Sequence, residues 1–242
     1  MAGEELKRAR VVAVVLAAGA SSRMEGTDKI FAPLAGRPLL FYSLALFQKC
    51  AEVDGVVVVG AAGEEGKLRE AASACGCEKL RAAVAGGAER RDSAAAGIAA
   101  AEEFAAPGAV VLIHDAARPL AGRKLIGRLL AALGSAEGAV PAVPVTDTIK
   151  AVAAGSGEVV ETLPREKLRA IQTPQAFRLT AIAAAYRAAA TERWPVTDDA
   201  AVLERAGGRV VTVEGDPDNF KITYPEDLSR AERVLERRNL AR

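Results

Sequence analysis

The sequence predicts a doubly wound α/β fold, in which a mostly parallel sheet lies between layers of helices. Short apolar runs rich in β-branched residues alternate along the chain with longer segments rich in alanine, leucine and charged residues. The apolar runs show no polar alternation, which is typical of strands buried on both faces of a parallel sheet. With 242 residues, half of them hydrophobic, the chain can bury a full core, and we expect one domain over 1–242.

The expected elements alternate in order along the chain. Strands are predicted at 11–16, 55–60, 110–115, 138–143 and 209–215. Helices are predicted at 37–50, 64–75, 89–106, 122–133 and 179–193, with a terminal helix that begins near 224–227. Several of these helical segments open near Pro or close at Gly, as helices tend to do. In this fold, ligands bind in a crevice at the carboxyl ends of the strands, so residues that follow strands are the candidate site residues.

The segment 145–168 departs from this alternation. It reads TIKAV, a turn around Gly155 and Gly157, and then EVVETL, which predicts a β-hairpin rather than a crossover helix. Inserted late in an α/β domain, such a hairpin would form an arm. The spacing alone favours an ordinary surface hairpin over an arm.

Composition excludes several classes of function. The formal net charge is +1 and no run of like charges occurs, so a role on nucleic acid or on a membrane surface has no support. The N-terminal segment leads into only about six apolar residues, too few for a secretory signal or a spanning helix, and we expect a cytoplasmic protein that binds small molecules. Three cysteines and a single histidine indicate reduced thiols rather than a zinc site.

The loop after the first strand has the composition of a phosphate-binding turn. Residues 17–22 carry no side chain larger than a hydroxymethyl group, so backbone amides can approach a ligand closely, and the cations Arg23 and Lys29 follow. The loop contains neither the Walker lysine motif nor the dinucleotide fingerprint. Tight packing of a small-residue loop explains the same composition, and the loop alone leaves both interpretations open.

The motif IHDAARP places a carboxylate at the end of a strand that is predicted to be central. Asp115 ends the strand and Arg118 follows three residues later. A carboxylate beside a polyphosphate suggests Mg²⁺, which normally takes one or two carboxylates together with phosphate oxygens; capping of a helix is the alternative. His114 should point to the opposite strand face from Asp115, and we interpret it as a structural residue.

A third cluster follows the last predicted strand, in EGDPDNFKITYPEDL. Asp216, Asp218 and Lys221 come close after the strand, and 224–227 begins the terminal helix. Because the strand ends converge in this architecture, Asp218 and Lys221 are expected to reach the same crevice as Asp115.

Together these blocks resemble a known family. LAAGASSRM, GGAERRDS, HDAARP, AVPVTDTIK, QTPQAF, VTDDAAVLE and EGDPDNFKITYPEDL, in this order from residue 11 to the terminal helix, are similar to the blocks of 2-C-methyl-D-erythritol 4-phosphate cytidylyltransferases of the non-mevalonate isoprenoid pathway. The resemblance implies a Rossmann-like nucleotidyltransferase fold and transfer of CMP from CTP to methylerythritol phosphate, with Mg²⁺ as cofactor. It also implies a homodimer joined through the arm at 145–168.

The resemblance assigns roles to individual residues. Those implied to bind the nucleotide are Ala17, Ala18, Gly19, Gly87, Ser93, Asp115 and Ala116, with Asp115 also the metal ligand. Those implied to act on the phosphates are Arg23, Lys29 and Lys221. Those implied to hold methylerythritol phosphate are Arg118, Thr148, Arg165 and Thr173, with Arg165 reaching from the arm of a neighbouring subunit.

The sequence departs from the family pattern at two places, and other functions stay open. Ser21 stands where the family loop usually has Gly, and Asp28 and Ile30 flank Lys29 where Pro and Gln are usual. Serine keeps the turn only if its φ stays negative. The alternatives are a ribitol 5-phosphate cytidylyltransferase, which differs in the acceptor pocket, and a nucleotide-binding regulatory module without chemistry. A dehydrogenase lacks its dinucleotide fingerprint here.

Overall fold

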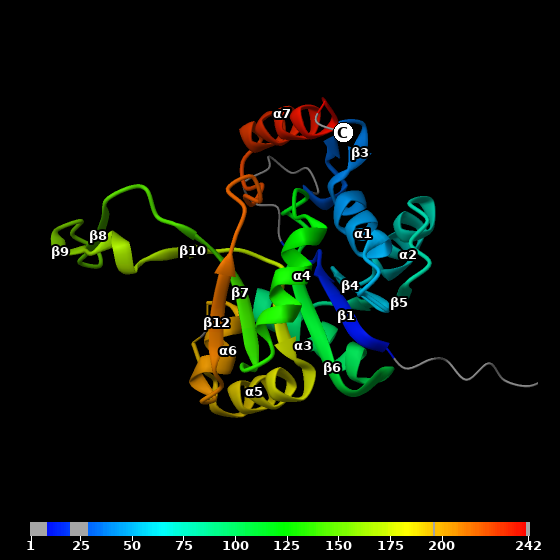
Figure 1. Ribbon diagram of the computed structural model, residues 1–242, viewed down its shortest axis with the longest axis horizontal. Coiled ribbons are helices and arrows are strands. Elements are labelled where there is room, and N and C mark those ends of the chain that lie inside the picture. The colour runs from blue at the N-terminus through cyan, green and yellow to red at the C-terminus, as the bar shows by residue number, and fades with distance from the viewer. Residues whose placement is uncertain (1–8, 20–28, 196, 241–242) are drawn as a thin grey trace, which may run out of the picture.

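A mostly parallel eight-stranded sheet forms the centre of the protein (Figure 1). The computed structural model describes residues 9–19, 29–195 and 197–240. The sheet order is β10-β7-β11-β6-β1-β4-β5, with β12 paired to β7. Its strands are β1 (Ala9–Leu16), β4 (Gly55–Gly60), β5 (Leu80–Ala85), β6 (Ala105–Asp115), β7 (Gly138–Pro144), β10 (Arg169–Ile171), β11 (Gln175–Arg178) and β12 (Val210–Glu214).

The pairing confirms the predicted fold class. Strand β1 pairs in parallel with both β4 and β6, β4 pairs in parallel with β5, and β7 pairs in parallel with β12. Only the short strands β10 and β11 run antiparallel to their neighbours in this sheet, within the part of the chain that the structure describes. The ends of β1 and β6 are therefore side by side, with Leu16 opposite Asp115.

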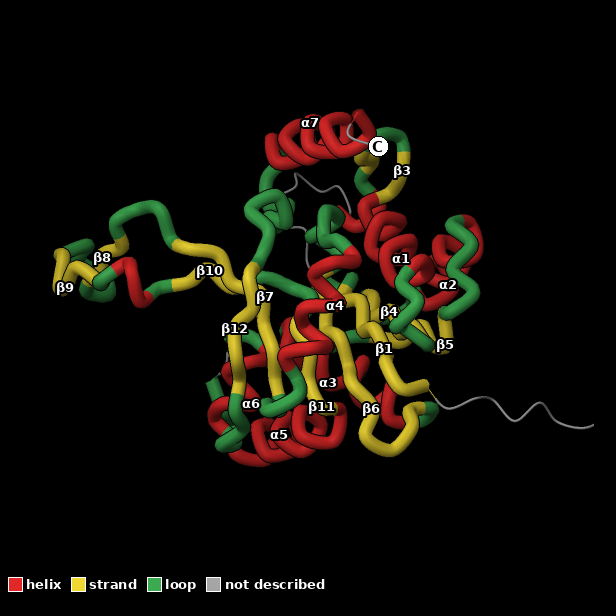
Figure 2. Tube along the Cα trace, in the orientation of Figure 1, coloured by secondary structure: helices red, strands yellow, loops and turns green. Residues whose placement is uncertain are grey.

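Helices cover both faces of the sheet (Figure 2). The helices on its two faces are α1 (Leu39–Lys49), α2 (Glu65–Ala74), α3 (Arg90–Glu102), α4 (Arg123–Ala132), α5 (Leu179–Glu192) and α6 (Asp199–Arg205), while α7 (Glu226–Leu240) packs beyond the end of the sheet. Helices α3, α5 and α6 pack on the face to which Val12 and Val14 point, and α1, α2 and α4 pack on the face of Ala13 and Val15. The period of two along a strand divides these residues between the two cores.

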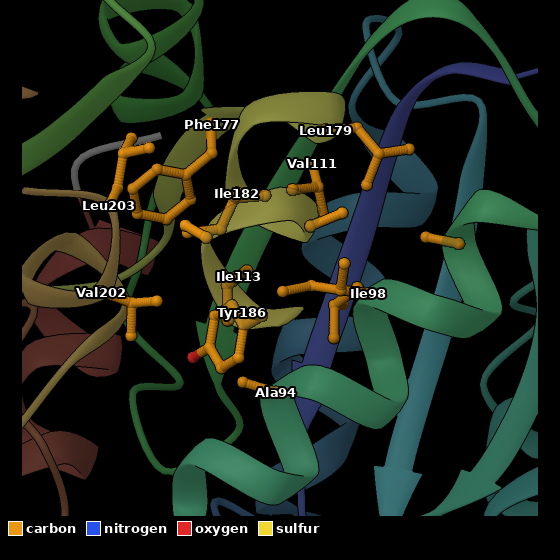
Figure 3. Packing of buried hydrophobic residues seen from close by; sticks show 14 of the residues in the cluster. Ala94, Ile98, Val111, Ile113, Phe177, Leu179, Ile182, Tyr186, Val202 and Leu203 are labelled. Carbon is orange, nitrogen blue, oxygen red and sulfur yellow. The ribbon is translucent and has the colours of Figure 1, made fainter. Parts of the chain in front are cut away.

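Close packing holds α3 against the sheet. Ile98 of α3 and Ile182 and Tyr186 of α5 meet Val111 and Ile113 of β6 in one buried cluster (Figure 3). Gly97 lets α3 approach further, because a β-carbon there would collide with Val14 and Val59. A small third cluster joins α7 to the segment 32–39, which contains the short pair β2 (Pro33–Leu34) and β3 (Arg37–Pro38).

The segment 145–168 forms the predicted hairpin. Strands β8 (Ile149–Val152) and β9 (Val159–Leu163) pair antiparallel and are followed by the 3-10 turn η2 (Arg165–Lys167). The hairpin projects away from the sheet (Figure 1), and its apolar residues Val152, Val159 and Val160 are exposed. Gly155 and Gly157 both have positive φ, as the tight turn between the strands requires.

Some expected elements differ from the structure. The segment 105–106, predicted as the end of a helix, belongs instead to β6, because pairing of Ala105 with Ala9 outweighs the helical preference of alanine. The same helix ends at Glu102, and 37–38 forms β3 rather than the start of α1. Strands β5, β10 and β11 and helix α6 were not predicted. None of the helices in the described ranges is long and apolar enough to cross a membrane.

Candidate active site

A cavity of about 180 Å³ lies over the carboxyl ends of β1 and β6. The residues that line it come from the first loop, from the start of α3 and from the segments after β6 and β12: Ala18, Gly19, Lys29, Gly87, Ala88, Glu89, Arg90, Ser93, Asp115, Ala117 and Lys221, with Leu16 and Ile30. Segments that are far apart in the sequence thus meet where the fold class predicts a ligand site.

The first loop leaves the sheet at the edge of this cavity. The N–H of Ala17 donates to the carbonyl of Val59 (2.7 Å), and the N–H of Ala116 donates to the carbonyl of Leu16 (3.0 Å). Both amides are therefore bonded to neighbouring strands, and neither Ala17 nor Ala116, two of the residues implied to bind the nucleotide, lines the cavity. Ala18 and Gly19 reach the cavity itself.

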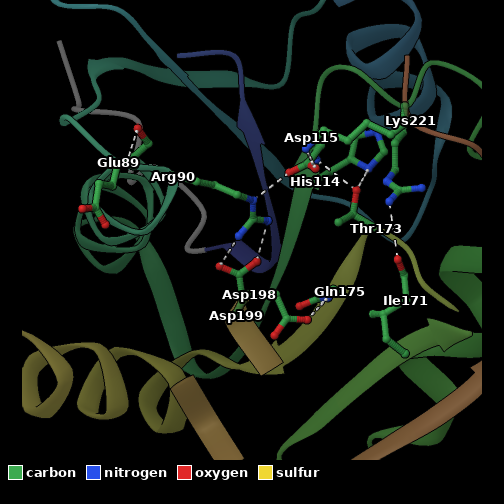
Figure 4. A network of polar contacts seen from close by, with 12 residues as sticks. Glu89, Arg90, His114, Asp115, Ile171, Thr173, Gln175, Asp198, Asp199 and Lys221 are labelled. Carbon is green, nitrogen blue, oxygen red and sulfur yellow. Dashed lines mark hydrogen bonds and ion pairs between the residues drawn. The ribbon is translucent and has the colours of Figure 1, made fainter. Parts of the chain in front are cut away.

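Asp115 is the charged centre of the site. The Nε–H of Arg90 donates to its Oδ1 (3.0 Å) and Nζ of Lys221 donates to its Oδ2 (2.8 Å), while the side chain is only 10% exposed. Burial alone would raise the pKa of Asp115, but the positive charges of Arg90 and Lys221 outweigh it and hold that pKa well below its ordinary value. Asp115 is therefore a carboxylate held between two cations, as Figure 4 shows.

Arg90 is a site residue that the sequence analysis missed. It is the first residue of α3, lines the cavity, and directs its two terminal nitrogens to Asp199, the first residue of α6 (3.1 and 2.8 Å). The available signal was its position within GGAERRDS, because a cation at a helix N-terminus opposes the helix dipole and needs compensating carboxylates. The partner Asp199 lies 109 residues away, and no spacing rule connects the two.

On the other side of Asp115, buried polar groups fix the backbone. The N–H of Asp115 donates to Oγ1 of Thr173 (3.0 Å), and the same oxygen lies 3.0 Å from Nδ1 of His114. His114 is fully buried, packs edge-on against Phe47 and does not line the cavity. Burial lowers its pKa to about 4, and this neutral histidine supports the strand end, as its position in the strand predicted.

Arg118 ties two segments of the site together. Its Nη1 donates to the carbonyl of Asn219 (2.9 Å) and its Nη2 to the carbonyl of Ile171 (3.4 Å), while Nδ2 of Asn219 donates to the carbonyl of Thr173 (2.9 Å). The N–H of Ile222 also donates to the carbonyl of Ala117 (2.8 Å). These bonds place Lys221, which lies between Asn219 and Ile222, beside the end of β6.

Three predicted residues lie away from the cavity. Asp218 was expected to reach it, but its Oδ2 accepts from Nη2 of Arg237 in α7 (2.8 Å) and it does not line the cavity. Thr148 and Arg165 are exposed on the arm, and Nη1 of Arg165 donates to the carbonyl of Thr146 (3.0 Å). Neither lines the cavity of its own chain. Arg23 lies outside the residues that the structure describes, as do Ser21 and Asp28.

The opposite wall of the cavity is built from glycine and serine. The N–H of Gly87 donates to Oγ of Ser93 (3.3 Å), which in turn donates to the carbonyl of Glu89 (3.3 Å). A β-carbon on Gly86 would collide with Ser93 and lie 2.8 Å from that of Ala18. The absence of a side chain at Gly86 thus allows this wall to approach the first loop.

Known proteins resemble the chain over almost its whole length. The family model described as 2-C-methyl-D-erythritol 4-phosphate cytidylyltransferase matches residues 11–237. A curated protein of that name from Rubrobacter xylanophilus is 46% identical over 225 residues, which cover 93% of this chain and 94% of the relative. A bifunctional IspD/IspF enzyme from Anaeromyxobacter dehalogenans is 43% identical, and the chain spans 56% of its length.

Solved structures agree with these sequence relationships. The 2-C-methyl-D-erythritol 4-phosphate cytidylyltransferase from Thermus thermophilus is 33% identical with a TM-score of 0.74, covering 92% of this chain and 98% of that one. The 4-diphosphocytidyl-2C-methyl-D-erythritol synthase from Anaerococcus prevotii is 28% identical with a TM-score of 0.79, covering 93% and 96%. The chain therefore belongs to the 2-C-methyl-D-erythritol 4-phosphate cytidylyltransferase family.

Proposed function

We propose that this protein transfers the cytidylyl group of CTP to 2-C-methyl-D-erythritol 4-phosphate and releases pyrophosphate. The observation that carries the proposal is the placement of Arg90, Lys221 and Asp115 together in one cavity with the bare backbone at Ala18 and Gly19. Cations beside backbone with small side chains in a cleft suit a triphosphate, and family membership supplies the identity of the nucleotide and the acceptor.

The reaction needs no nucleophile from the protein. A phosphate oxygen of methylerythritol phosphate attacks the α-phosphorus of CTP, and a new P–O bond forms. The bond from the α-phosphorus to the oxygen that bridges to the β-phosphorus breaks, and its electron pair leaves with pyrophosphate. Because the attacking phosphate is already ionised, no general base is required, and the protein's work is to align two anions and neutralise their charge.

The described residues divide this work between them. Lys221 and Lys29 supply ammonium groups at the cavity, and the guanidinium of Arg90 lies beside them. We assign the phosphates to this end of the cavity and the cytosine to the wall formed by Gly87 and Ser93. Thr173, adjacent to Asp115, and Arg118, which fixes the backbone next to it, mark the side from which the acceptor phosphate approaches.

Asp115 suits a Mg²⁺ ion that arrives with the triphosphate. No group of three or more histidine, cysteine or acidic residues that could hold a metal occurs in the described ranges. The acidic residues that line the cavity are Asp115 and Glu89. A carboxylate has about four lone-pair sites, and Arg90 and Lys221 use one each. Mg²⁺ commonly uses one carboxylate together with phosphates and water, and when bound it would supply further positive charge to the phosphates.

We further propose that two copies of the chain form a homodimer through the arm. Thr148 and Arg165 lie on the projecting hairpin, away from the cavity of their own chain, and exposed valines flank them. An arm of this shape can reach the cavity of a second copy, where Arg165 would meet the acceptor phosphate. Exposed apolar side chains on such a hairpin are better explained by an interface than by solvent.

The test of the activity is pyrophosphate release by the purified chain with CTP, Mg²⁺ and methylerythritol phosphate. We expect release only when all three are present, and a much slower reaction with ATP, GTP or UTP. Ribitol 5-phosphate serves as the competing acceptor. Faster release with ribitol 5-phosphate would replace the proposed acceptor, and no release with either acceptor would refute the proposed function.

A further inference from the structure

Asp199 is a buried carboxylate that lies behind the active site. It is the first residue of α6, it is fully buried and it does not line the cavity. Its Oδ1 accepts from Nη1 of Arg90 (3.1 Å) and from the hydroxyl of Tyr186 (2.6 Å), and its Oδ2 accepts from Nη2 of Arg90 (2.8 Å). A carboxylate that does not line the cavity can influence the reaction only through the groups that it contacts.

The guanidinium of Arg90 links Asp199 to Asp115. Both terminal nitrogens bond to Asp199 and the remaining Nε–H bonds to Asp115 (Figure 4). Because the guanidinium is planar and rigid, a partner that fixes its two terminal nitrogens also fixes the direction of the third donor. Burial lowers the pKa of Arg90, but Asp199 and Asp115 more than compensate, so the pKa is raised and the group stays charged.

Tyr186 completes the support from a third element. It lies on α5, so residues from α3, α5 and α6 meet at this carboxylate. Burial and the charge of Asp199 raise the pKa of Tyr186, which keeps the phenol protonated as a donor. The position of Asp199 is thereby determined by helix packing and does not depend on a ligand.

We infer that Asp199 is a positioning residue for the proposed transfer, acting through Arg90 on Asp115. By holding both terminal nitrogens of Arg90, it limits the arginine to one bond with Asp115, so that Arg90 and Lys221 each take one lone pair of that carboxylate. The inference rests on the proposed function, since it concerns how Arg90 and Asp115 are oriented at the end of the cavity that the proposal assigns to the nucleotide phosphates.

Replacing Asp199 by asparagine should release Arg90 toward the active site. The amide has no charge, and its NH₂ group faces a guanidinium N–H where the native oxygen accepted a bond. Asp115 is then the remaining acidic partner of Arg90 among the described residues, and a two-bond pair with it is the favoured geometry. A displacement of about an ångström at a catalytic centre costs roughly 10- to 100-fold in turnover.

The first experiment compares Asp199→Asn with Asp198→Asn in steady-state assays of pyrophosphate release by the full-length chain. Asp198 is the matched control, because it is the neighbouring carboxylate and bonds to Ala201 and Gln175, not to Arg90. Asparagine also caps helices well. We expect Asp199→Asn to lower kcat by roughly 10- to 100-fold with KM for CTP changed by less than about threefold, and Asp198→Asn to stay within about twofold.

The second experiment is a double-mutant cycle with Arg90→Ala. If Asp199 acts through Arg90, adding Asp199→Asn to Arg90→Ala should cause no further loss of kcat. If Asp199 merely stabilises the fold, the losses of kcat in the two single variants multiply in the double variant, and each loss accompanies a drop in thermal stability. The inference would be overturned if Asp199→Asn and Asp198→Asn lowered kcat equally, or if the effects of Asp199→Asn and Arg90→Ala on the activation free energy were additive.

Two further measurements keep the test decisive. If Asp199→Asn does not fold, Tyr186→Phe takes its place, since it removes only the 2.6 Å bond to Asp199 and keeps both ion pairs of Arg90. We expect Tyr186→Phe to lower kcat in the native background and to have no effect beside Arg90→Ala; an effect in both backgrounds would refute the inference. Lack of activity in the unmodified chain would instead refute the proposed function.

Discussion

Replacing Gly97 by alanine tests how tightly α3 is held against the sheet. A β-carbon there would collide with Cγ1 of Val14 and lie 2.9 Å from Cγ2 of Val59, and both valines are fully buried. Alanine in place of a helical glycine gains about 1 kcal/mol of helix propensity. Overpacking a core costs about 1–3 kcal/mol, and β-branched neighbours have few rotamers with which to yield. We therefore expect a net loss of up to about 2 kcal/mol in the free energy of unfolding.

The matched controls are Gly66→Ala in α2 and Gly127→Ala in α4, where a β-carbon meets nothing within 4 Å. These two variants gain the propensity without the clash, so each should be more stable by about 0.5–1 kcal/mol. Urea unfolding curves of the three variants and the unmodified chain measure the differences. A stabilising effect of Gly97→Ala comparable to the controls would show that α3 can retreat without cost, and the packing argument would be wrong.

Three further predictions concern the site, the arm and the cysteines. Lys221→Ala should lower turnover by about two to three orders of magnitude, the usual loss of one preorganised charged donor, and unchanged turnover in the pyrophosphate assay would remove Lys221 from the mechanism. If Arg165 acts in the site of the neighbouring subunit, mixing inactive Arg165→Ala and Lys221→Ala chains should restore up to about a quarter of the native activity, because half of the dimers are mixed and each mixed dimer has one intact site. Native mass spectrometry should confirm that the subunits exchange. If they exchange and no activity returns, the shared site is refuted. Burial raises the pKa of both Cys50 and Cys77 to about 11, so iodoacetamide at pH 8 should modify these thiols only after the protein unfolds. If mass spectrometry finds both alkylated within minutes in the folded protein, their burial in the core is contradicted.

The elements that the sequence predicted well are those with a strong local pattern. The runs at 11–16, 55–60 and 110–113 contain only apolar residues and glycine, and they lie in β1, β4 and the end of β6 at the centre of the sheet. Strand β5 was missed because its residues LRAAVA contain three alanines and an arginine, which have little β propensity, and pairing with β4 alone makes it a strand.

The same distinction applies to the site. Asp115 and Lys221 were predicted because each follows a strand of a fold in which the strand ends converge, and they lie 2.8 Å apart across 106 residues of sequence. Arg90 was quoted within a motif but received no role, since its role depends on Asp199, and helix packing alone brings these two residues together.

The sequence by itself determined the layered α/β architecture, the loops that follow its strands and the family to which the chain belongs, because periodicity, small residues and ordered motifs are properties of local segments. Only the tertiary structure decided how charge is distributed in the site. Asp115 shares Arg90 with a carboxylate from α6, and Thr148 and Arg165 lie on the arm, away from the cavity. Ion pairing depends on distances between segments that are remote in the sequence, and those distances are set by the packing of helices on the sheet.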